Sequence, residues 1–223
     1  MILPAWQPLV LTLQLATVTT LLLLLVGIPL AWWLVFGGSR GRVVVETLVA
    51  LPLVLPPTVL GFYLLLLFSP TSWLGGWLLR ELGVRLTFSF AGLVVGSVLF
   101  SLPFMIQPLV AGFRQLPKVW VEAARTLGKG EATILWRVTL PNIRGSLLSA
   151  IILTFAHTVG EFGVVLMLGG NIAGETRVAS IALYHEVEQL NNAAAHGYAL
   201  VLVLFSFVVL LGLRLMQPAL ERR

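Results

Sequence analysis

Long apolar stretches dominate the chain and predict transmembrane helices. A helix needs about 20 apolar residues to cross the hydrocarbon core of a bilayer. The runs are continuous and rich in leucine rather than alternating, which favours helices over the strands of a barrel. The predicted spans are residues 9–36, 43–68, 88–113, 147–168 and 198–215. We therefore expect an all-α integral membrane protein, with one transmembrane domain over residues 1–223 and about five helices.

The composition supports a membrane environment. Hydrophobic residues make up 58% of the 223 residues and charged residues only 10%, whereas soluble domains carry about 25% charged residues. There is no cysteine, which excludes disulfides, a thiol nucleophile and thiolate metal sites. The net charge of +5 lies in loops between apolar spans, so we expect contact with lipid and no nucleic acid.

The distribution of lysine and arginine predicts the orientation, because cytoplasmic loops carry an excess of both. With the N-terminus outside and the C-terminus inside, eleven of the 14 fall inside. The three outside are Arg80, Arg85 and Arg177. The inside set is Arg40, Arg42, Arg114, Lys118, Arg125, Lys129, Arg137, Arg144, Arg214, Arg222 and Arg223. The opposite orientation would invert this ratio.

Proline interrupts several spans. Pro52, Pro56 and Pro57 lie within six residues of the second span. Each proline removes a backbone donor and can kink a helix. The kinks either fit helices into the bundle or shape a gate. Two outer segments, 69–87 with its tryptophans and a short helix at 177–189, lie between spans, and the sequence leaves open whether the second enters the membrane as a partial sixth element.

Two ionisable residues fall inside the fourth span. His157 and Glu161 are four residues apart, so on a continuous helix they share one face. An ionisable residue within the bilayer suggests function, although a structural role is an equal alternative. One histidine with one glutamate makes a poor metal site, so we expect none. Gly160 and Gly163 allow either close helix packing or an exposed backbone, and His185 in the outer loop is interpreted as solvated.

Signatures of catalysis are absent from the sequence. It contains neither G-x-S-x-G nor H-E-x-x-H. The one Gly-Lys pair, Gly128 and Lys129, has Ala123 where a phosphate-binding loop requires glycine. We therefore expect no ATP hydrolysis by this chain, and any driving energy would come from a partner or an ion gradient.

The inner loop, residues 114–146, is the longest charged segment. Residues 122–127 predict a short helix that ends at Gly128. Ala123 and Ala124 would present a small surface that another protein can approach. From the residues alone, a docking helix and an ordinary interfacial helix are equally good interpretations.

The spacing in this loop resembles the EAA loop of ABC-importer permeases. Glu122-Ala123-Ala124 is followed after three residues by Gly128, and after nine more by Val138-Thr139-Leu140-Pro141. Val138 replaces the isoleucine of the pattern. The resemblance implies a type I permease bundle in the bacterial inner membrane. It also implies that the loop couples to a cytoplasmic ATPase through Glu122, Ala123, Ala124, Gly128, Leu140 and Pro141.

The same resemblance implies the partners. The ATPase subunits would bind ATP and Mg, and this chain would hold no cofactor. A periplasmic binding protein would deliver the substrate, and a second copy of the permease would complete the pathway as a homodimer. Alternating access would couple ATP hydrolysis to transport.

Three further segments resemble molybdate permeases. They are Leu51–Gly61, Gly160–Gly163 and Asn171–Arg177. Sulfate and tungstate permeases share much of this pattern, so molybdate is favoured and they remain the alternatives. The resemblance implies a pathway or gate near Pro56, Pro57, Thr58, Gly160, Glu161, Gly163 and Asn171. Arg177 either guides anions or has a structural role. A membrane-embedded enzyme or a secondary carrier is disfavoured, because neither accounts for the inner-loop motif.

Overall fold

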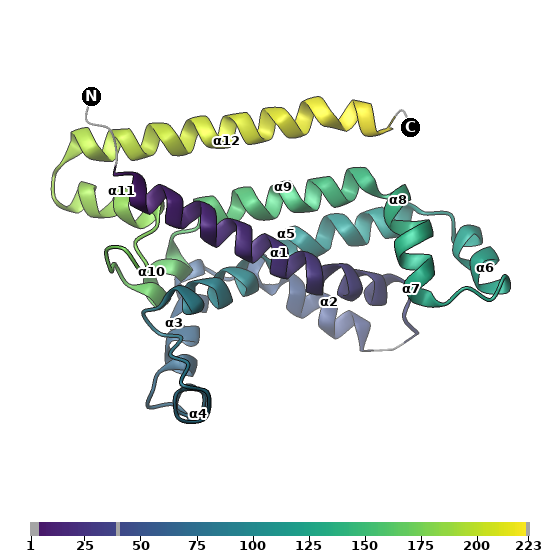
Figure 1. Ribbon diagram of the computed structural model, residues 1–223, viewed down its shortest axis with the longest axis horizontal. Coiled ribbons are helices and arrows are strands. Elements are labelled where there is room, and N and C mark those ends of the chain that lie inside the picture. Colours follow the sequence, from purple (N-terminus) through teal and green to yellow (C-terminus); the bar gives the residue numbers. More distant parts are fainter. Residues whose placement is uncertain (1–4, 39–40, 222–223) are drawn as a thin grey trace.

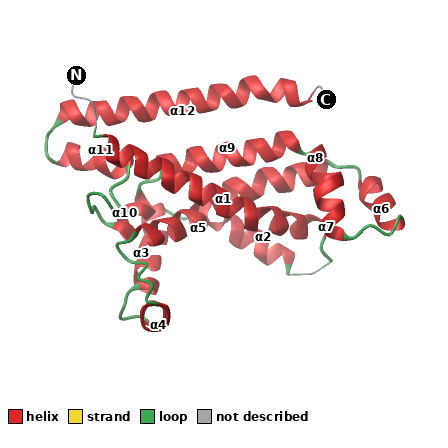
Figure 2. Cartoon of the chain, viewed as in Figure 1, coloured by secondary structure: helices red, strands yellow, loops and turns green. Residues whose placement is uncertain are grey.

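The structure is a computed structural model that describes residues 5–38 and 41–221. Within them the chain is helical and forms no strand (Figure 2), which confirms the all-α fold. Arg40, Arg222 and Arg223, three of the basic residues used for orientation, lie outside the described residues. The elements are α1 Trp6–Phe36, α2 Arg42–Ala50, η1 Leu51–Leu53, α3 Pro57–Phe68, α4 Trp73–Leu82, α5 Phe90–Gln115, α6 Lys118–Thr126, α7 Glu131–Ile134, η2 Leu135–Thr139, α8 Leu140–Asn142, α9 Arg144–Gly160, α10 Gly163–Gly169, α11 Ala179–Glu188 and α12 Asn192–Glu221.

Across residues 5–38 and 41–221, three uninterrupted helices are long and apolar enough to cross a membrane: α1, α5 and α12 up to Leu215. The largest buried cluster joins α1 and α5, with Leu23, Met105 and Ile106 fully or almost fully buried. A side chain at Gly27 would have its Cβ 2.8 Å from Met105 Cγ, so glycine lets these two helices approach closely. α12 runs along one side of the bundle (Figure 1).

The second span, predicted over residues 43–68 with interruption by proline, consists of two helical parts separated by a break. α2 with η1 and α3 form an angle of 111° at a short break. Pro56 precedes α3 in an extended conformation, and Pro57 is the first residue of α3. Two consecutive prolines lack N–H groups and disfavour helix in the residue before each of them. The helical hydrogen bonding therefore stops here and begins again at α3.

The fourth span differs from the prediction of one helix over residues 147–168. α9 ends at Gly160, and α10 begins at Gly163. Glu161, with ψ of 133°, is extended. At its other end, α9 makes an 85° bend with the preceding helical segment, residues 131–142. In the described part of the chain, up to five spans result when each bent pair is counted as one.

Short helices lie at both ends of the bundle. α6 and α7 lie at one end, and α11 lies at the other, beside the start of α1 (Figure 1). α4 forms a helix within the outer segment 69–87, and Trp73 is 83% exposed. α11 confirms the short helix predicted at 177–189. α11 has ten residues, about half of what a spanning helix needs, and its first turn is buried against the bundle.

Candidate functional site

The inner-loop helix α6 has two different faces. Val121 and Ala124 are buried, 2% and 9% exposed, and they form a cluster with Ile134 of α7. Trp32 of α1 packs against this cluster. The three-residue spacing of Val121 and Ala124 places both on the same side of the helix. α6 is therefore attached to the end of α1 by apolar contacts.

The opposite face of α6 is free of the chain's own core. Glu122, Ala123 and Gly128 are exposed. The prediction that both alanines offer a surface to a partner is wrong for Ala124, because Ala124 packs inward with Val121. A partner approaching α6 would instead meet Glu122 and Ala123, together with the exposed side chains of Val119, Trp120 and Leu127.

Gly128 ends α6 in a left-handed conformation, with φ of 71°. The Gly128 amide donates to the Arg125 carbonyl at 2.9 Å, and the Lys129 amide donates to the Ala124 carbonyl at 3.1 Å. This pair of bonds is a Schellman motif, which terminates helices at a left-handed residue. No atom lies within 4 Å of where a Cβ would be, so backbone conformation rather than space selects glycine here.

Beyond Gly128, an ion pair connects α6 to α7. Arg125 donates to both carboxylate oxygens of Glu131, at 2.7 and 3.0 Å. These hydrogen bonds hold the pKa of Glu131 below its usual value. Leu140 is buried in the main core, and Pro141 is half-buried at the start of α8. The second half of the motif thus packs within the chain, whereas Glu122 and Ala123 of the first half are exposed.

The two broken spans meet each other. A Cβ on Gly163 would lie 2.7 Å from Pro57 Cβ and 3.3 Å from the Thr58 amide nitrogen. One turn further, a Cβ on Gly61 would lie 2.8 Å from Met167 Cβ. Gly163 therefore permits close packing of α3 on α10, as the packing interpretation of this glycine requires. Pro56, Pro57 and Thr58 keep an exposed side.

Glu161 occupies the break between α9 and α10. Glu161 is 4% exposed, and its carboxylate oxygens have no hydrogen-bond partner among the described residues. Ser97 of α5 lies beside the carboxylate outside hydrogen-bond geometry. The Glu161 carbonyl accepts a 2.5 Å bond from the Ser180 hydroxyl of α11. Gly160, in contrast, is exposed with open space around its Cβ position.

His157 does not share a helix face with Glu161, because α9 ends between them. Its Nδ1 lies 2.9 Å from the Ser101 hydroxyl of α5, and Ser101 lies 3.0 Å from the Thr158 hydroxyl. The Phe104 ring stacks on the imidazole at 3.8 Å. These contacts give His157 a packing role between α5 and α9. Among the described residues, no group of three histidines and acids is arranged to hold a metal.

The outer loop contains a polar network that the sequence did not predict. Arg177 Nε donates to Asn171 Oδ1 at 2.5 Å, and the Asn171 amide nitrogen lies 3.2 Å from Nδ1 of His185. Since the arginine fixes the orientation of the Asn171 amide, its nitrogen donates to His185. His185 is thus a bonded member of this loop, contrary to the interpretation as merely solvated. The side chain of Asn171 bonds to Arg177 and His185, so these hydrogen bonds do not connect it to the broken second span.

The described residues thus form a helical bundle with candidate membrane spans, two of them interrupted, and an exposed short helix at one end. The family model for the inner membrane component of binding-protein-dependent transport systems matches residues 7–223. The chain belongs to this family of importer permeases.

Individual relatives agree with this assignment. The chain is 50% identical over 204 residues to the molybdenum transport system permease protein ModB of Azotobacter vinelandii, covering 91% of this chain and 90% of the relative. It is 34% identical over 213 residues to the sulfate transport system permease protein CysW of Synechocystis, covering 96% and 75%. It is also 33% identical to ModB of Escherichia coli over 181 residues, covering 81% and 79%.

Solved structures share the fold. The MetNI methionine ABC transporter in an inward-facing conformation matches with a TM-score of 0.70 at 18% identity, covering 94% of this chain and 93% of that chain. A bacterial ABC transporter involved in alginate import matches with a TM-score of 0.67 at 20% identity, covering 96% and 79%. The bundle is therefore the fold of ABC-importer permeases.

Proposed function

We propose that this chain forms the transmembrane pathway for molybdate in an ATP-driven importer. The observation that supports molybdate as the substrate is the 50% identity to the A. vinelandii molybdenum permease, which extends over nine-tenths of both chains. The sulfate permease of Synechocystis, at 34%, supports sulfate as the second candidate, and tungstate is chemically closest to molybdate. The chain lies in the bacterial inner membrane with its N-terminus outside.

In this proposal, α6 is the coupling helix. Glu122, Ala123 and Gly128 contact a cytoplasmic ATPase subunit, because they form the exposed side of α6. Ala124 and Leu140 act within the chain, where they hold the coupling helix against the bundle. ATP and Mg bind to the ATPase, as expected for a member of this family of importer permeases.

In this proposal, α1 transmits a movement of α6 to the part of the chain inside the membrane. Val121 and Ala124 pack with Trp32 and Phe36 near the end of α1. At the other end of α1, the Thr12 hydroxyl accepts a 2.8 Å bond from the amide of Ala179, the first residue of α11. The next residue, Ser180, binds the carbonyl of Glu161. α1 thus physically connects the ATPase-docking end with the break in the fourth span.

The gate lies where the second and fourth spans break. Pro57 and Thr58 contact Gly163 there, and Glu161 lies two residues before Gly163 in the break. Glu161 is buried at this break, so its side chain shapes the gate from inside the bundle and does not contact the oxyanion. Asn171 and Arg177 belong to the outer mouth, where Arg177 attracts anions. Selectivity comes mainly from a periplasmic molybdate-binding protein.

A second copy of the permease completes the pathway. α3 leaves large apolar side chains exposed, among them Phe62, Tyr63 and Leu66. They continue from the exposed prolines at the break, so the same surface lies beside the proposed gate. A homodimer that joins two such surfaces would enclose the route between the copies.

The substrate is tested by uptake of labelled molybdate in cells that lack their own molybdate permease. This chain is expressed with its ATPase and binding protein, and excess tungstate or sulfate is added. Inhibition by tungstate and not by sulfate supports the proposal. Strong inhibition by sulfate, with uptake of labelled sulfate, moves the assignment to a sulfate permease.

The coupling role is tested by Glu122→Arg. Glu122 is exposed, so the variant should fold and insert while its binding to the ATPase weakens and uptake stops. The matched control is Glu175→Arg, an exposed residue of the outer loop, which should retain ATPase binding. Normal uptake by Glu122→Arg would contradict the assignment of α6.

A further inference from the structure

A pocket opens at the end of the bundle that carries α6. It lies between the end of α1, the start of α2 and the end of α5, and its volume is about 600 Å³. This size lies within the range of small-ligand sites, about 300–1,000 Å³. Phe36, Val43 and Phe113 contribute an apolar wall. The pocket is separate from the proposed gate, which involves α3 and α10.

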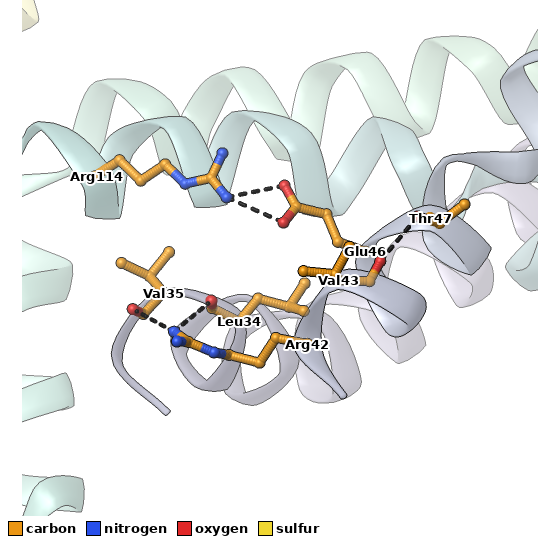
Figure 3. A network of polar contacts seen from close by, with 7 residues as sticks. All are labelled: Leu34, Val35, Arg42, Val43, Glu46, Thr47 and Arg114. Carbon is orange, nitrogen blue, oxygen red and sulfur yellow. Dashed lines mark hydrogen bonds and ion pairs between the residues drawn. The ribbon is translucent and has the colours of Figure 1, made fainter. Parts of the chain in front are cut away.

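The polar lining of the pocket is mainly basic. Arg42, Arg114 and Lys118 line it together with one acid, Glu46. Arg114 Nη2 lies 2.9 and 3.0 Å from the two oxygens of Glu46 (Figure 3). Among the described residues of the lining, three cations and one anion give a net charge of +2, before the partial negative charge at the end of α1 is counted. An anion is therefore the ligand that this pocket favours.

Two of these cations retain donors for a ligand. Arg114 uses one nitrogen for Glu46, and across residues 5–38 and 41–221 its other nitrogens have no bonded acceptor. Its side chain is 56% exposed. In the same ranges the Lys118 ammonium has no bonded acceptor, and Lys118 is exposed. Glu46 thus orients Arg114 without saturating it.

Arg42 has a different role in the wall. Its Nη1 donates to the carbonyls of Leu34 and Val35, at 3.3 and 3.1 Å (Figure 3). These carbonyls belong to the last turn of α1, whose C-terminal end carries a partial negative charge. Arg42 offsets that charge, so the end of α1 does not repel an anion from the pocket.

We propose that this pocket binds the headgroup of an anionic phospholipid, with the phosphate between Arg114 and Lys118. The inference rests on the proposed topology, in which this end of the bundle faces the cytoplasmic leaflet. Basic pockets between transmembrane helices on that side suit such headgroups. The apolar wall contacts the lipid next to its phosphate, which a free oxyanion does not require. A choline headgroup binds less well, because its cation faces a lining of the same sign.

The test is lipid binding to the purified transporter, this chain assembled with its ATPase, followed by native mass spectrometry. The probes are dioctanoyl phosphatidylglycerol and dioctanoyl phosphatidylcholine. We expect phosphatidylglycerol to bind more tightly by about fivefold or more, since one basic residue near a membrane surface contributes about that factor. Lys118→Gln should remove about fivefold, and Arg114→Gln a similar factor.

Lys129→Gln is the matched control, because Lys129 is an exposed lysine of the same loop that does not line the pocket. It should bind phosphatidylglycerol like the unaltered chain. Lys118→Gln leaves the Arg114–Glu46 pair intact, so it tests the pocket even where Arg114→Gln folds poorly. Equal binding of the two lipids, or equal effects of Lys118→Gln and Lys129→Gln, would overturn the proposal.

Two further outcomes would also overturn it. Displacement of the lipid by millimolar inorganic phosphate would identify a site for free oxyanions. Lipid binding by the isolated chain that disappears on assembly with the ATPase would show that the ATPase covers the pocket. None of these measurements depends on transport, so their failure leaves the uptake test of molybdate unaffected.

Discussion

Replacing Gly163 by alanine tests whether close contact between the two broken spans stabilises the protein. The added methyl group would lie 2.7 Å from Pro57 Cβ, 3.3 Å from the Thr58 nitrogen and 3.4 Å from the Pro57 carbonyl carbon. Unstrained carbon pairs are about 3.5–4.0 Å apart. A proline ring and backbone atoms cannot rotate out of the way, so α3 and α10 must separate.

The magnitude follows from two opposing effects. Overpacking of this kind costs about 1–3 kcal/mol, and alanine gains at most about 1 kcal/mol of helix propensity over glycine. We expect Gly163→Ala to lower the free energy of unfolding by about 1–2 kcal/mol. For a chain of this length, that corresponds to a fall in Tm of roughly 2–8 °C.

Gly160→Ala is the matched control within the same four-residue motif. No atom lies within 4 Å of its Cβ position, so the helix-propensity gain is not opposed by a clash. Thermal unfolding of both purified variants in one detergent gives the comparison. Equal Tm values for Gly163→Ala and Gly160→Ala would refute the close-packing argument, and a higher Tm for Gly163→Ala would refute it more strongly.

Three further predictions concern the two proposed sites. Ala124→Leu should lower Tm because Ala124 is buried, whereas Ala123→Leu should keep Tm and weaken ATPase binding in a pull-down; the reverse result would exchange their assigned faces. Because ion pairing lowers the folded-state pKa of Glu131, its stabilisation is present above the usual glutamate pKa, about 4.5, and is lost as pH falls through the lower folded value. Unfolding between pH 7 and 3 should reveal this loss, at most about 1 kcal/mol for so exposed a pair, and Glu131→Gln should remove it. Glu161→Met should raise Tm, because it removes buried oxygens that lack partners, while uptake falls; unchanged uptake would exclude Glu161 from the gate.

The membrane helices could be predicted because the length of each run of apolar residues can be read directly from the sequence. The first span was predicted over 9–36 and is Trp6–Phe36, and the third was predicted over 88–113 and is Phe90–Gln115. The helix stop at Gly128 was also predictable. Glycine at the end of a short polar helix is a local signal, and its outcome, φ of 71°, depends on few distant contacts.

The breaks were harder to predict, because proline alone does not determine them. Pro29, Pro103 and Pro108 all lie inside continuous helices. The second span breaks where two prolines are consecutive, and the fourth breaks at Glu161 without any proline. A single proline removes one hydrogen bond from a helix, and neighbouring groups can offset that loss. Two adjacent prolines remove two consecutive hydrogen bonds, so the helix does not continue through them.

Contacts between distant residues could not be predicted from one sequence. Arg114 and Glu46 are 68 residues apart, and the Ala179 amide reaches Thr12 across 167 residues. The inward direction of Ala124 also depends on where α1 ends, because Trp32 and Phe36 cover that side of α6. Each of these pairings is determined by tertiary packing, which hydrophobic periodicity does not specify.

The two breaks reduce the cost of unpaired backbone groups in an apolar environment in different ways. An unsatisfied carbonyl in hydrocarbon costs several kcal/mol, about as much as a mutation that unfolds a marginal protein. At the fourth span, Ser180 donates to the Glu161 carbonyl. At the second, the prolines at 56 and 57 have no N–H groups that need acceptors. Since Ser180 lies beside the Thr12–Ala179 bond, moving α1 would shift the donor that stabilises one break, and the Pro57–Gly163 contact would transmit that shift to the other.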